Sequence, residues 1–183
     1  MTDLRYPIGE FERRDELNAD ERRAMIDTIA AAPARMREAV SGLSDAQLDT
    51  PYRDGGWTVR QVIHHVPDSH MNAYVRFKLA LTEENPVIKP YDEAAWARAA
   101  DTARTPVDVS LTLLEALHRR WVVLLESLAP ADFARPLVHP DYGPLTIDWL
   151  LQLYAWHGRH HAAHVAELRK REGWDAGGAD PPA

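Results

Sequence analysis

Residues 146–172, TIDWLLQLYAWHGRHHAAHVAELRKRE, have the pattern of one long amphipathic helix. Thr146 is a candidate N-cap, and Asp148 is favourably placed against the positive end of the helix dipole. At about 100° per residue, the apolar residues gather on one face; they are Ile147, Leu150, Leu153, Tyr154, Val165 and Leu168. His157 and His161 point in the same direction as this face. The sequence therefore predicts a helix whose buried side carries two imidazoles, one turn apart.

Three more long amphipathic helices are predicted upstream, over residues 18–42, 58–81 and 106–130. The first two begin with capping-box sequences, and the third has a proline in its first turn and another proline at its end. Pro33 is expected to kink or split the first helix, and Pro67 is expected to kink the second.

The connections between these helices indicate how they are arranged. Residues 83–105 contain two prolines and several polar residues, which predicts a long crossover with a short helix around 92–99. Residues 1–17 are expected to be extended, and 175–183, rich in Gly, Ala and Pro, to be disordered. No alternating strand pattern is present. The expected fold is an all-α four-helix bundle with a long crossover, forming one domain over residues 1–174.

Composition excludes several classes of function. The chain has 183 residues, a formal net charge of −7 and a pI of about 5.7, so no basic surface is available to neutralise a nucleic acid. It contains no cysteine, so a metal site would have only nitrogen and oxygen ligands. The first residues lack the apolar stretch of a signal peptide, and no long apolar run is present. We expect a cytoplasmic protein that binds neither nucleic acid nor membranes.

The histidines indicate the chemistry. Four of the nine histidines lie within residues 157–164, and His64 and His65 form a pair in the second predicted helix. Two helical histidines four residues apart, with a distant third, can form a site with three nitrogen ligands and an open position for water. The cluster lacks the glutamate of the HExxH motif. A metal-dependent enzyme is the leading hypothesis; a hydrogen-bonded core element and a weakly specific surface metal site are the alternatives.

Polar residues form a stripe along one face of the second helix around His65. They are Gln61, Ser69, Asn72 and Arg76. The stripe is either a face exposed to solvent or the lining of a pocket, in which Asn72 and Arg76 would orient a polar or anionic substrate. His64 points about 100° away from His65 and also fits a core position.

Longer motifs resemble a known family. The run GWTVRQVIHHVPDSHMN, residues 56–72, is similar to the YfiT branch of the DinB superfamily. Further matching pieces are YPIG at 6–9, LDTPYR at 48–53, RFKLALTE at 76–83, PYDE at 90–93 and YAWH at 154–157. The resemblance covers nearly all of residues 5–174. It implies a four-helix bundle with a long crossover, and an activity like that of predicted metal-dependent hydrolases, which bind zinc or nickel and often form homodimers.

The family's ligand triad falls on His65 in the second helix and on His157 and His161 in the last, which implies about one metal ion per chain. Pro67 departs from the family pattern, which has alanine there; it lies two residues from His65 and can shift the helix axis at that ligand. A zinc ion held by three imidazoles lowers the pKa of bound water to about 7, which suits a hydrolase. The candidates for its general base are Asp68, Glu83, Asp92 and His160.

Two other functions are compatible with such a site. One is transfer of a low-molecular-weight thiol, since other branches of the superfamily resemble bacillithiol S-transferases. A positively lined pocket would favour it, with Arg53, Arg60 and Arg76 as contributors. The other is a non-catalytic metal-binding stress protein, whose site would be closed by a fourth protein ligand such as His160 or Asp68.

Overall fold

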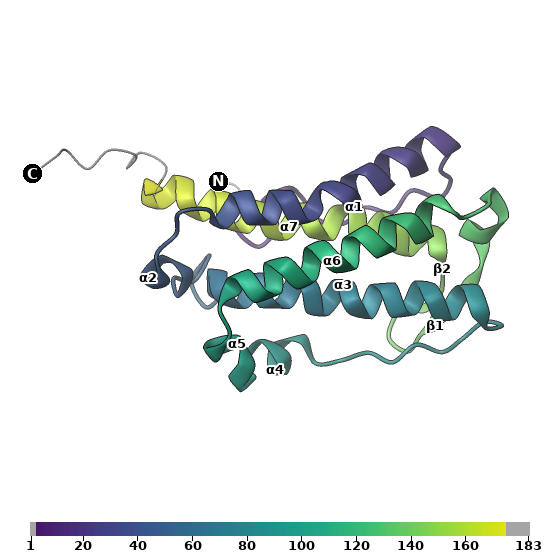
Figure 1. Cartoon of the computed structure of the whole chain (residues 1–183). Helices are drawn as coiled ribbons and strands as arrows, with labels where there is room; N and C mark the ends of the chain where they lie inside the picture. Colours follow the sequence, from purple (N-terminus) through teal and green to yellow (C-terminus); the bar gives the residue numbers. More distant parts are fainter. Residues whose placement is uncertain (1–2, 175–183) are drawn as a thin grey trace, which may run out of the picture.

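The structure is a computed structural model that describes residues 3–174, and four long helices dominate it (Figure 1). These are α1 (Ala19–Val40), α3 (Val59–Thr82), α6 (Val107–Glu126) and α7 (Ile147–Glu172). The predicted four-helix bundle is confirmed, and the predicted boundaries are correct to within a few residues. The tail 175–183, predicted to be disordered, lies outside the described residues. No helix among residues 3–174 combines the length and the apolar character that a membrane span requires.

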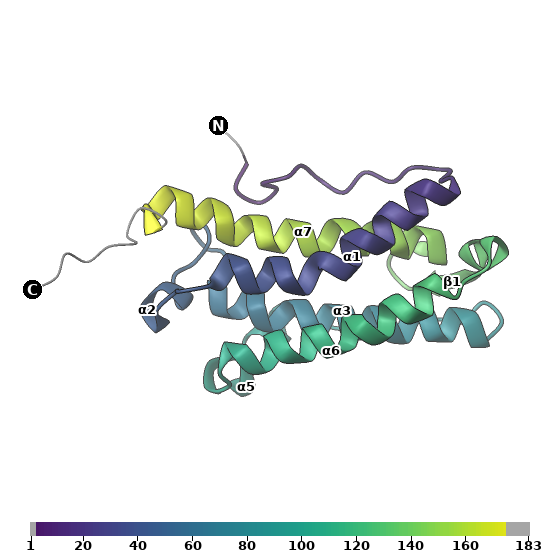
Figure 2. The same cartoon turned by 45° about the horizontal axis from the view of Figure 1, so that its top comes forward.

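The four helices form a ring in which each packs on two neighbours. α1 lies against α6 and α7, and α3 lies against the same two helices. α3 and α6 run in the same direction, so residues 83–106 return along the length of the bundle between them (Figures 1 and 2). This crossover carries α4 (Glu93–Ala97) and α5 (Ala100–Arg104), where the sequence predicted a single short helix. The connection confirms the predicted crossover.

Side-chain caps begin most of these helices. Asn18 and Thr58 each accept a hydrogen bond from the backbone three residues on and complete a capping box, as predicted; Ser44 does the same for α2 (Asp45–Leu48). Thr146 accepts from the backbone N–H of Trp149 and so caps α7. Helix α1 runs without a break through Pro33, so the predicted split does not occur.

A small hairpin, which was not expected from the sequence, precedes α7. A 3₁₀ turn, η1 (Pro130–Ala134), leads into the antiparallel strands β1 (Pro136–His139) and β2 (Gly143–Thr146). Each strand has four residues, too few to show alternation, and the turn uses the positive φ of Gly143 (74°). Ile88 donates to the carbonyl of Val138 at 3.0 Å, which fastens the crossover to the hairpin.

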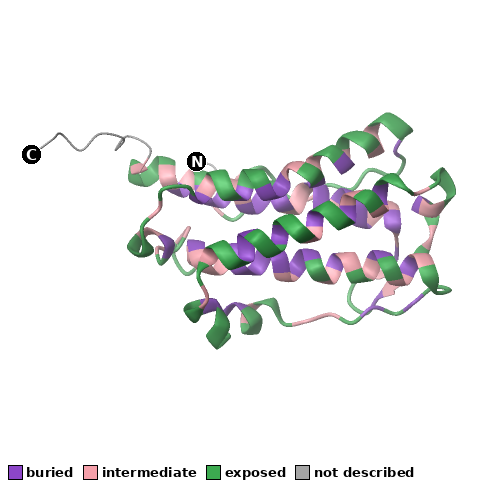
Figure 3. Cartoon of the chain, viewed as in Figure 1, coloured by how far each residue is buried: buried purple, intermediate pink, exposed green. Residues whose placement is uncertain are grey.

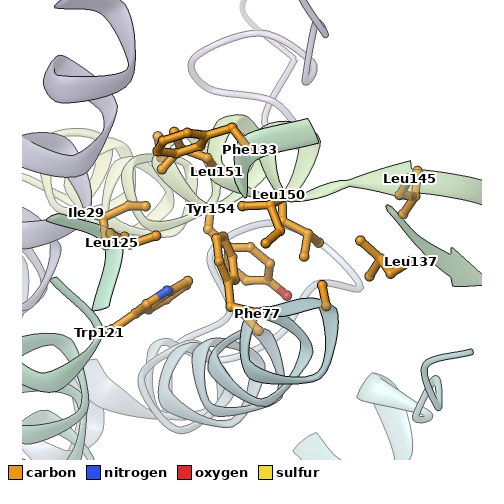
Figure 4. Packing of buried hydrophobic residues seen from close by; sticks show 14 of the residues in the cluster. Ile29, Phe77, Trp121, Leu125, Phe133, Leu137, Leu145, Leu150, Leu151 and Tyr154 are labelled. Carbon is orange, nitrogen blue, oxygen red and sulfur yellow. The ribbon is translucent and has the colours of Figure 1, made fainter. Parts of the chain in front are cut away.

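The core consists of two apolar clusters along the bundle axis. One, shown in Figure 4, contains Phe77, Trp121 and Tyr154; the other lies nearer the opposite end and includes Ile63 and Leu114. Buried residues follow the inward faces of all four helices (Figure 3). Each fully buried large apolar side chain contributes about 1.5–3 kcal/mol. These clusters hold the helices together on both sides of a polar layer.

The polar layer falls at the same level of each long helix. On α3, α6 and α7, the residues between the two apolar clusters include His70, His118 and His157. On α1, the corresponding position is Pro33. The bundle therefore places these three histidines at mid-height, between two apolar regions.

Candidate metal centre

Three histidines from two helices converge within this layer. His65 of α3 and His157 and His161 of α7 each offer a ring nitrogen, and the three nitrogens lie within 4.8 Å of one another. The ring centroids are 5.4 Å apart for His65 and His157, 4.9 Å for His65 and His161, and 4.5 Å for His157 and His161. The four-residue spacing on α7 places two imidazoles one turn apart on the same face, and the neighbouring helix α3 supplies the third.

The three imidazoles are held in the neutral form that binds metals. His65 and His161 are 4% and 8% exposed, and His157 is partly buried. Burial lowers the pKa of His65 to about 4, and it lowers the pKa of His157 and of His161 well below the ordinary value. At neutral pH each ring therefore keeps one unprotonated nitrogen, with its lone pair free for a cation.

These residues fit a divalent transition metal. Three imidazole nitrogens suit zinc, nickel, copper or iron, and three protein ligands leave a coordination position open. Nδ1 of His161 is buried and has no hydrogen-bond partner among the described residues. Such an orphaned polar atom is costly unless a ligand satisfies it. His65, His157 and His161 would hold the ion.

The other histidines have different surroundings. His160 and His164 do not belong to the converging group, and His164 donates from Nε2 to the carbonyl of Arg5 at 3.1 Å. His64 is buried beside Ser110, with Nδ1 2.7 Å from the hydroxyl oxygen. His64 is therefore a core histidine, one of the positions that the sequence allowed for it.

A cavity of about 580 Å³ opens onto the triad. Aromatic rings form much of its wall, including Trp57, Tyr142, Tyr154 and Trp156. Its polar lining includes Ser69, Arg76, Tyr91 and Glu93, and the hydroxyl of Tyr91 is buried without a hydrogen-bond partner among the described residues. The cavity is large enough for a small organic molecule and offers it both apolar and polar contacts.

The structure separates the two residues of the predicted substrate-binding pair. Arg76 lines the cavity, so this part of the polar stripe faces a pocket. Asn72 is not among the lining residues, and its amide donates to the carbonyl of Asp68 one turn earlier at 2.9 Å.

Of the three arginines predicted to make a positive pocket, two line the cavity and one does not. Arg53 lines the same cavity as Arg76. Arg60 does not, because its guanidinium is bound by Asp45 at 2.9 Å and by Asp49 at 2.7 Å, beside a different cavity. The prediction for Arg60 is therefore wrong, since nearby carboxylates neutralise it.

The acidic residues are placed differently from the predictions. Of the four candidates for a general base, His160 lines the cavity, whereas Asp92 serves as the N-cap of α4, accepting from Ala95 at 2.8 Å. Asp68 and Glu83 are not among the lining residues. Glu93, which was not predicted as a site residue, lines the cavity; the residue is exposed as a whole, but desolvation of its carboxyl raises the pKa of that group. It is the first residue of α4, and a helix of five residues is too short for its period to indicate a direction.

Residues 3–18 run along α7 (Figure 2). Gln152 exchanges two hydrogen bonds with the backbone of Arg14, at 2.8 and 3.1 Å, and Trp156 donates to the carbonyl of Gly9 at 3.3 Å. These contacts fix the outer face of α7, opposite the core, and so help to hold the helix that carries two of the three candidate ligands.

Comparison with known proteins identifies the family. Residues 28–165 match the model of the DinB superfamily. A protein of Bacillus cereus (strain AH820) and one of Bacillus anthracis, each named "Putative metal-dependent hydrolase", are both 54% identical over 174 residues, covering 95% of this chain and 100% of theirs.

Solved structures agree with this family. YfiT from Bacillus subtilis, described as a probable metal-dependent hydrolase with an unusual four-helix bundle topology, has a TM-score of 0.91 at 49% identity, over 93% of this chain and 98% of its own. The four-helix bundle protein TT2238 shares the fold, with a TM-score of 0.55 and 18% identity over 80% of this chain and 98% of its own. The chain belongs to the DinB superfamily.

Proposed function

We propose that this protein is a metal-dependent enzyme that hydrolyses a small-molecule substrate, with a divalent ion held by His65, His157 and His161. The observation that carries the proposal is the convergence of three neutral imidazoles, two of them buried and that of His157 partly buried, with one nitrogen of each within 4.8 Å of the others, on the wall of a cavity of about 580 Å³. The names of the relatives from Bacillus cereus and Bacillus subtilis support it. The converging group contains three residues of the described chain, which favours an open site over one closed by a fourth protein ligand.

The residues around the triad would divide the remaining work. When bound, the ion supplies a Lewis acid that acidifies a coordinated water. Arg76 would bind an anionic group of the substrate, and the unpaired hydroxyl of Tyr91 would donate a hydrogen bond to it. Glu93 would accept the proton that water loses, since its raised pKa makes it a stronger base than an ordinary carboxylate. Asn72, one turn before Arg76 on the same face of α3, is retained in this proposal as a residue that would orient the substrate.

The proposed cofactor is one zinc or nickel ion per chain. We further propose a homodimer in the cytoplasm, as the family resemblance implies. Elemental analysis of the purified, untagged protein and its sedimentation behaviour would test the ion and the dimer.

The test of the proposed function compares three proteins: the wild type, His65→Ala and His64→Ala. The wild type and His64→Ala should each retain about one ion per chain and hydrolyse members of a panel of activated esters and amides, whereas His65→Ala should lose both properties. The proposal is wrong if the metal-loaded wild type hydrolyses none of the panel, or if His65→Ala keeps its metal and its rate.

Transfer of a thiol is the second candidate, and the lining of the cavity favours it. Arg53 and Arg76 both line the cavity beside the triad, together with the carboxylates of Glu93 and Asp141, and the two guanidinium groups would bind an anionic group of the thiol cofactor. The two activities differ in the nucleophile. Incubation of the metal-loaded protein with an electrophile, with and without a low-molecular-weight sugar thiol, would yield a thioether under transfer and the water adduct under hydrolysis.

A further inference from the structure

A line of hydrogen bonds connects the candidate ligand His157, through two other helices, to the backbone of α1. Nδ1 of His157 lies 3.0 Å from Nε2 of His70. Nδ1 of His70 lies 2.7 Å from Nε2 of His118. Nδ1 of His118 lies 2.7 Å from the carbonyl oxygen of Ile29. The line therefore crosses from α7 through α3 and α6 to α1, and both of its middle rings are buried.

A proline makes the carbonyl at the far end available. In an α-helix the carbonyl of Ile29 would accept the N–H of the residue four positions later, which here is Pro33. Proline has no N–H, so the carbonyl of Ile29 has no partner within its own helix. A buried carbonyl of this kind requires another donor, and His118 provides it.

Simple proton counting then assigns the tautomer of every ring. A carbonyl only accepts, so Nδ1 of His118 carries a proton, and burial, which lowers the pKa of His118 to about 4, keeps its Nε2 unprotonated. Nε2 of His118 therefore accepts from Nδ1 of His70. Nε2 of His70 in turn accepts from Nδ1 of His157.

The last ring in the line is the candidate ligand. With its proton on Nδ1, His157 has its lone pair on Nε2. That nitrogen lies 3.5 Å from the hydroxyl of Ser69, a residue of the cavity wall, so the lone pair faces the site.

The packing around the line is also close. A Cβ on Gly158 would lie 3.0 Å from Cβ of Ala32 and 3.5 Å from Cε1 of His70. Glycine thus lets α7 approach α1 at the residue next to His157. A larger side chain would push apart the helices that the line connects.

We propose that His70 and His118 are positioning residues, which transmit the hydrogen bond of the Ile29 carbonyl across the bundle and fix His157 in the tautomer that presents Nε2 to the metal. The functional role that we infer for this line rests on the proposed metal site. The tautomer of His157 does not, because it is a property of the metal-free protein. Partners beyond the first ligands commonly change metal affinity 10- to 100-fold.

The first test is made without metal. Two-bond ¹H–¹⁵N correlation spectra of the labelled, metal-free protein report which ring nitrogen of each histidine carries the proton. The wild type should show His157 as a single form protonated on Nδ1. His118→Phe keeps a ring of similar size but removes both nitrogens, and it should produce a mixture of the two forms at His157. The matched control is His64→Phe, a buried histidine outside the line, which should leave His157 unchanged.

The second test uses zinc affinity, measured by competition with a chromophoric chelator. His118→Phe should bind zinc about 10- to 100-fold more weakly than the wild type, and His64→Phe should match the wild type. Pro33→Ala gives the Ile29 carbonyl its helical N–H back, so it should weaken zinc binding in the same direction while it strengthens helix α1. If Pro33 had only a structural role, Pro33→Ala would not weaken zinc binding while it strengthens the helix. This variant also keeps the proposal testable if His118→Phe does not fold.

The outcomes separate this inference from the proposed function. Unchanged tautomer populations at His157 in both His118→Phe and Pro33→Ala would overturn the inference, even if the wild type binds zinc tightly. A wild type that binds no zinc, but whose His157 tautomer shifts in His118→Phe, would support the hydrogen-bonded line and reject the metal site.

Discussion

The rings of His65 and His161 lie with their centroids 4.9 Å apart, although one belongs to α3 and the other to α7. The ring of Trp57 packs on the ring of His65, with their centroids 4.7 Å apart, and limits how far the imidazole of His65 can turn. The two imidazoles therefore already lie near each other in the folded bundle. A metal that bridges them would join two helices that are far apart in the sequence.

The first prediction ranks the histidines of α7. His161→Ala should abolish stoichiometric metal binding, whereas His160→Ala should weaken it far less, because His160 lies outside the converging group. Equilibrium dialysis followed by elemental analysis would measure the stoichiometry. The reverse ranking would show that the ligand set is misassigned.

Metal binding should also stabilise the fold. An ion that binds only the native state, at a free concentration 1,000 times its dissociation constant, adds about 4 kcal/mol to the free energy of unfolding. The two apolar clusters do not depend on the ion, so a chelator should lower the melting temperature without unfolding the protein at 25 °C. Calorimetry with zinc and with chelator would check this. His65→Ala is the control, because its melting temperature should not respond to zinc.

Periodicity predicted the helices and the inward direction of two candidate ligands, and failed elsewhere for identifiable reasons. The apolar positions of α7 give the inward direction of His157 and His161, because a regular helix fixes angles along its whole length. For α3 the same angles left a solvent face and a pocket equally possible, and the structure places Arg76 and Ser69 on the pocket. The choice between His64 and His65 needed the family resemblance.

What the sequence could not indicate lies in irregular segments and in contacts between helices. Tyr91 and Glu93 reach the cavity from the crossover, whose path depends on the hairpin bond between Ile88 and Val138. Pro33 looked like a helix breaker, but neighbouring helices hold α1 intact, and His118 satisfies the carbonyl that the proline leaves free. Such compensation is a tertiary contact and has no local signature.

A change at Arg76 should separate substrates by charge. Arg76→Met removes the guanidinium from the cavity wall but keeps an unbranched side chain. Under the proposed function, KM for an anionic substrate should rise at least about tenfold, as expected for one lost charge-assisted hydrogen bond, and KM for a neutral analogue should change little. Steady-state kinetics on the pair would measure both. Equal losses on the two substrates would argue against a role for Arg76 in recognising charge.

Replacement of Glu93 should affect turnover and not metal content. Glu93→Gln should lower kcat by about 10²–10⁴, the usual contribution of a general base, and Glu84→Gln, an exposed carboxylate on the same connection, should not. Because burial raises the pKa of Glu93, the acid limb of the wild-type pH–rate profile should lie above the ordinary carboxyl value of 4.5. An acid limb at or below that value would assign the proton transfer to another group.

His118 should make the protein sensitive to acid. Its pKa is lowered from 6.5 to about 4 by burial, so the unfolded state takes up a proton before the native state does. The contribution of the neutral ring to the free energy of unfolding is fully present above pH 6.5 and is lost as the pH falls from 6.5 through 4. The loss amounts to about 3 kcal/mol. Urea unfolding of the metal-free wild type and of His118→Phe at pH 7 and pH 4 would show a smaller drop in the variant.

Arg22 and Asp148 join the start of α1 to the first turn of α7 by two hydrogen bonds, at 2.9 and 2.8 Å. Their side chains are only 22% and 16% exposed, and the guanidinium also lies over the ring of Phe133 at 4.9 Å. Asp148 further complements the dipole of the helix that carries His157 and His161. Asp148→Asn should therefore lower the free energy of unfolding by about 1–3 kcal/mol.

The matched control is Asp108→Asn, which breaks the ion pair with Arg37 at 2.7 Å between two largely exposed side chains. Solvent screens that pair, so its loss should cost less than about 1 kcal/mol. Urea unfolding in low and high salt would compare the two variants. If both lose the same small amount, the Arg22–Asp148 pair acts as an ordinary surface ion pair, and the entry of α7 into the bundle is held by the apolar contacts of Ile147 and Leu150 instead.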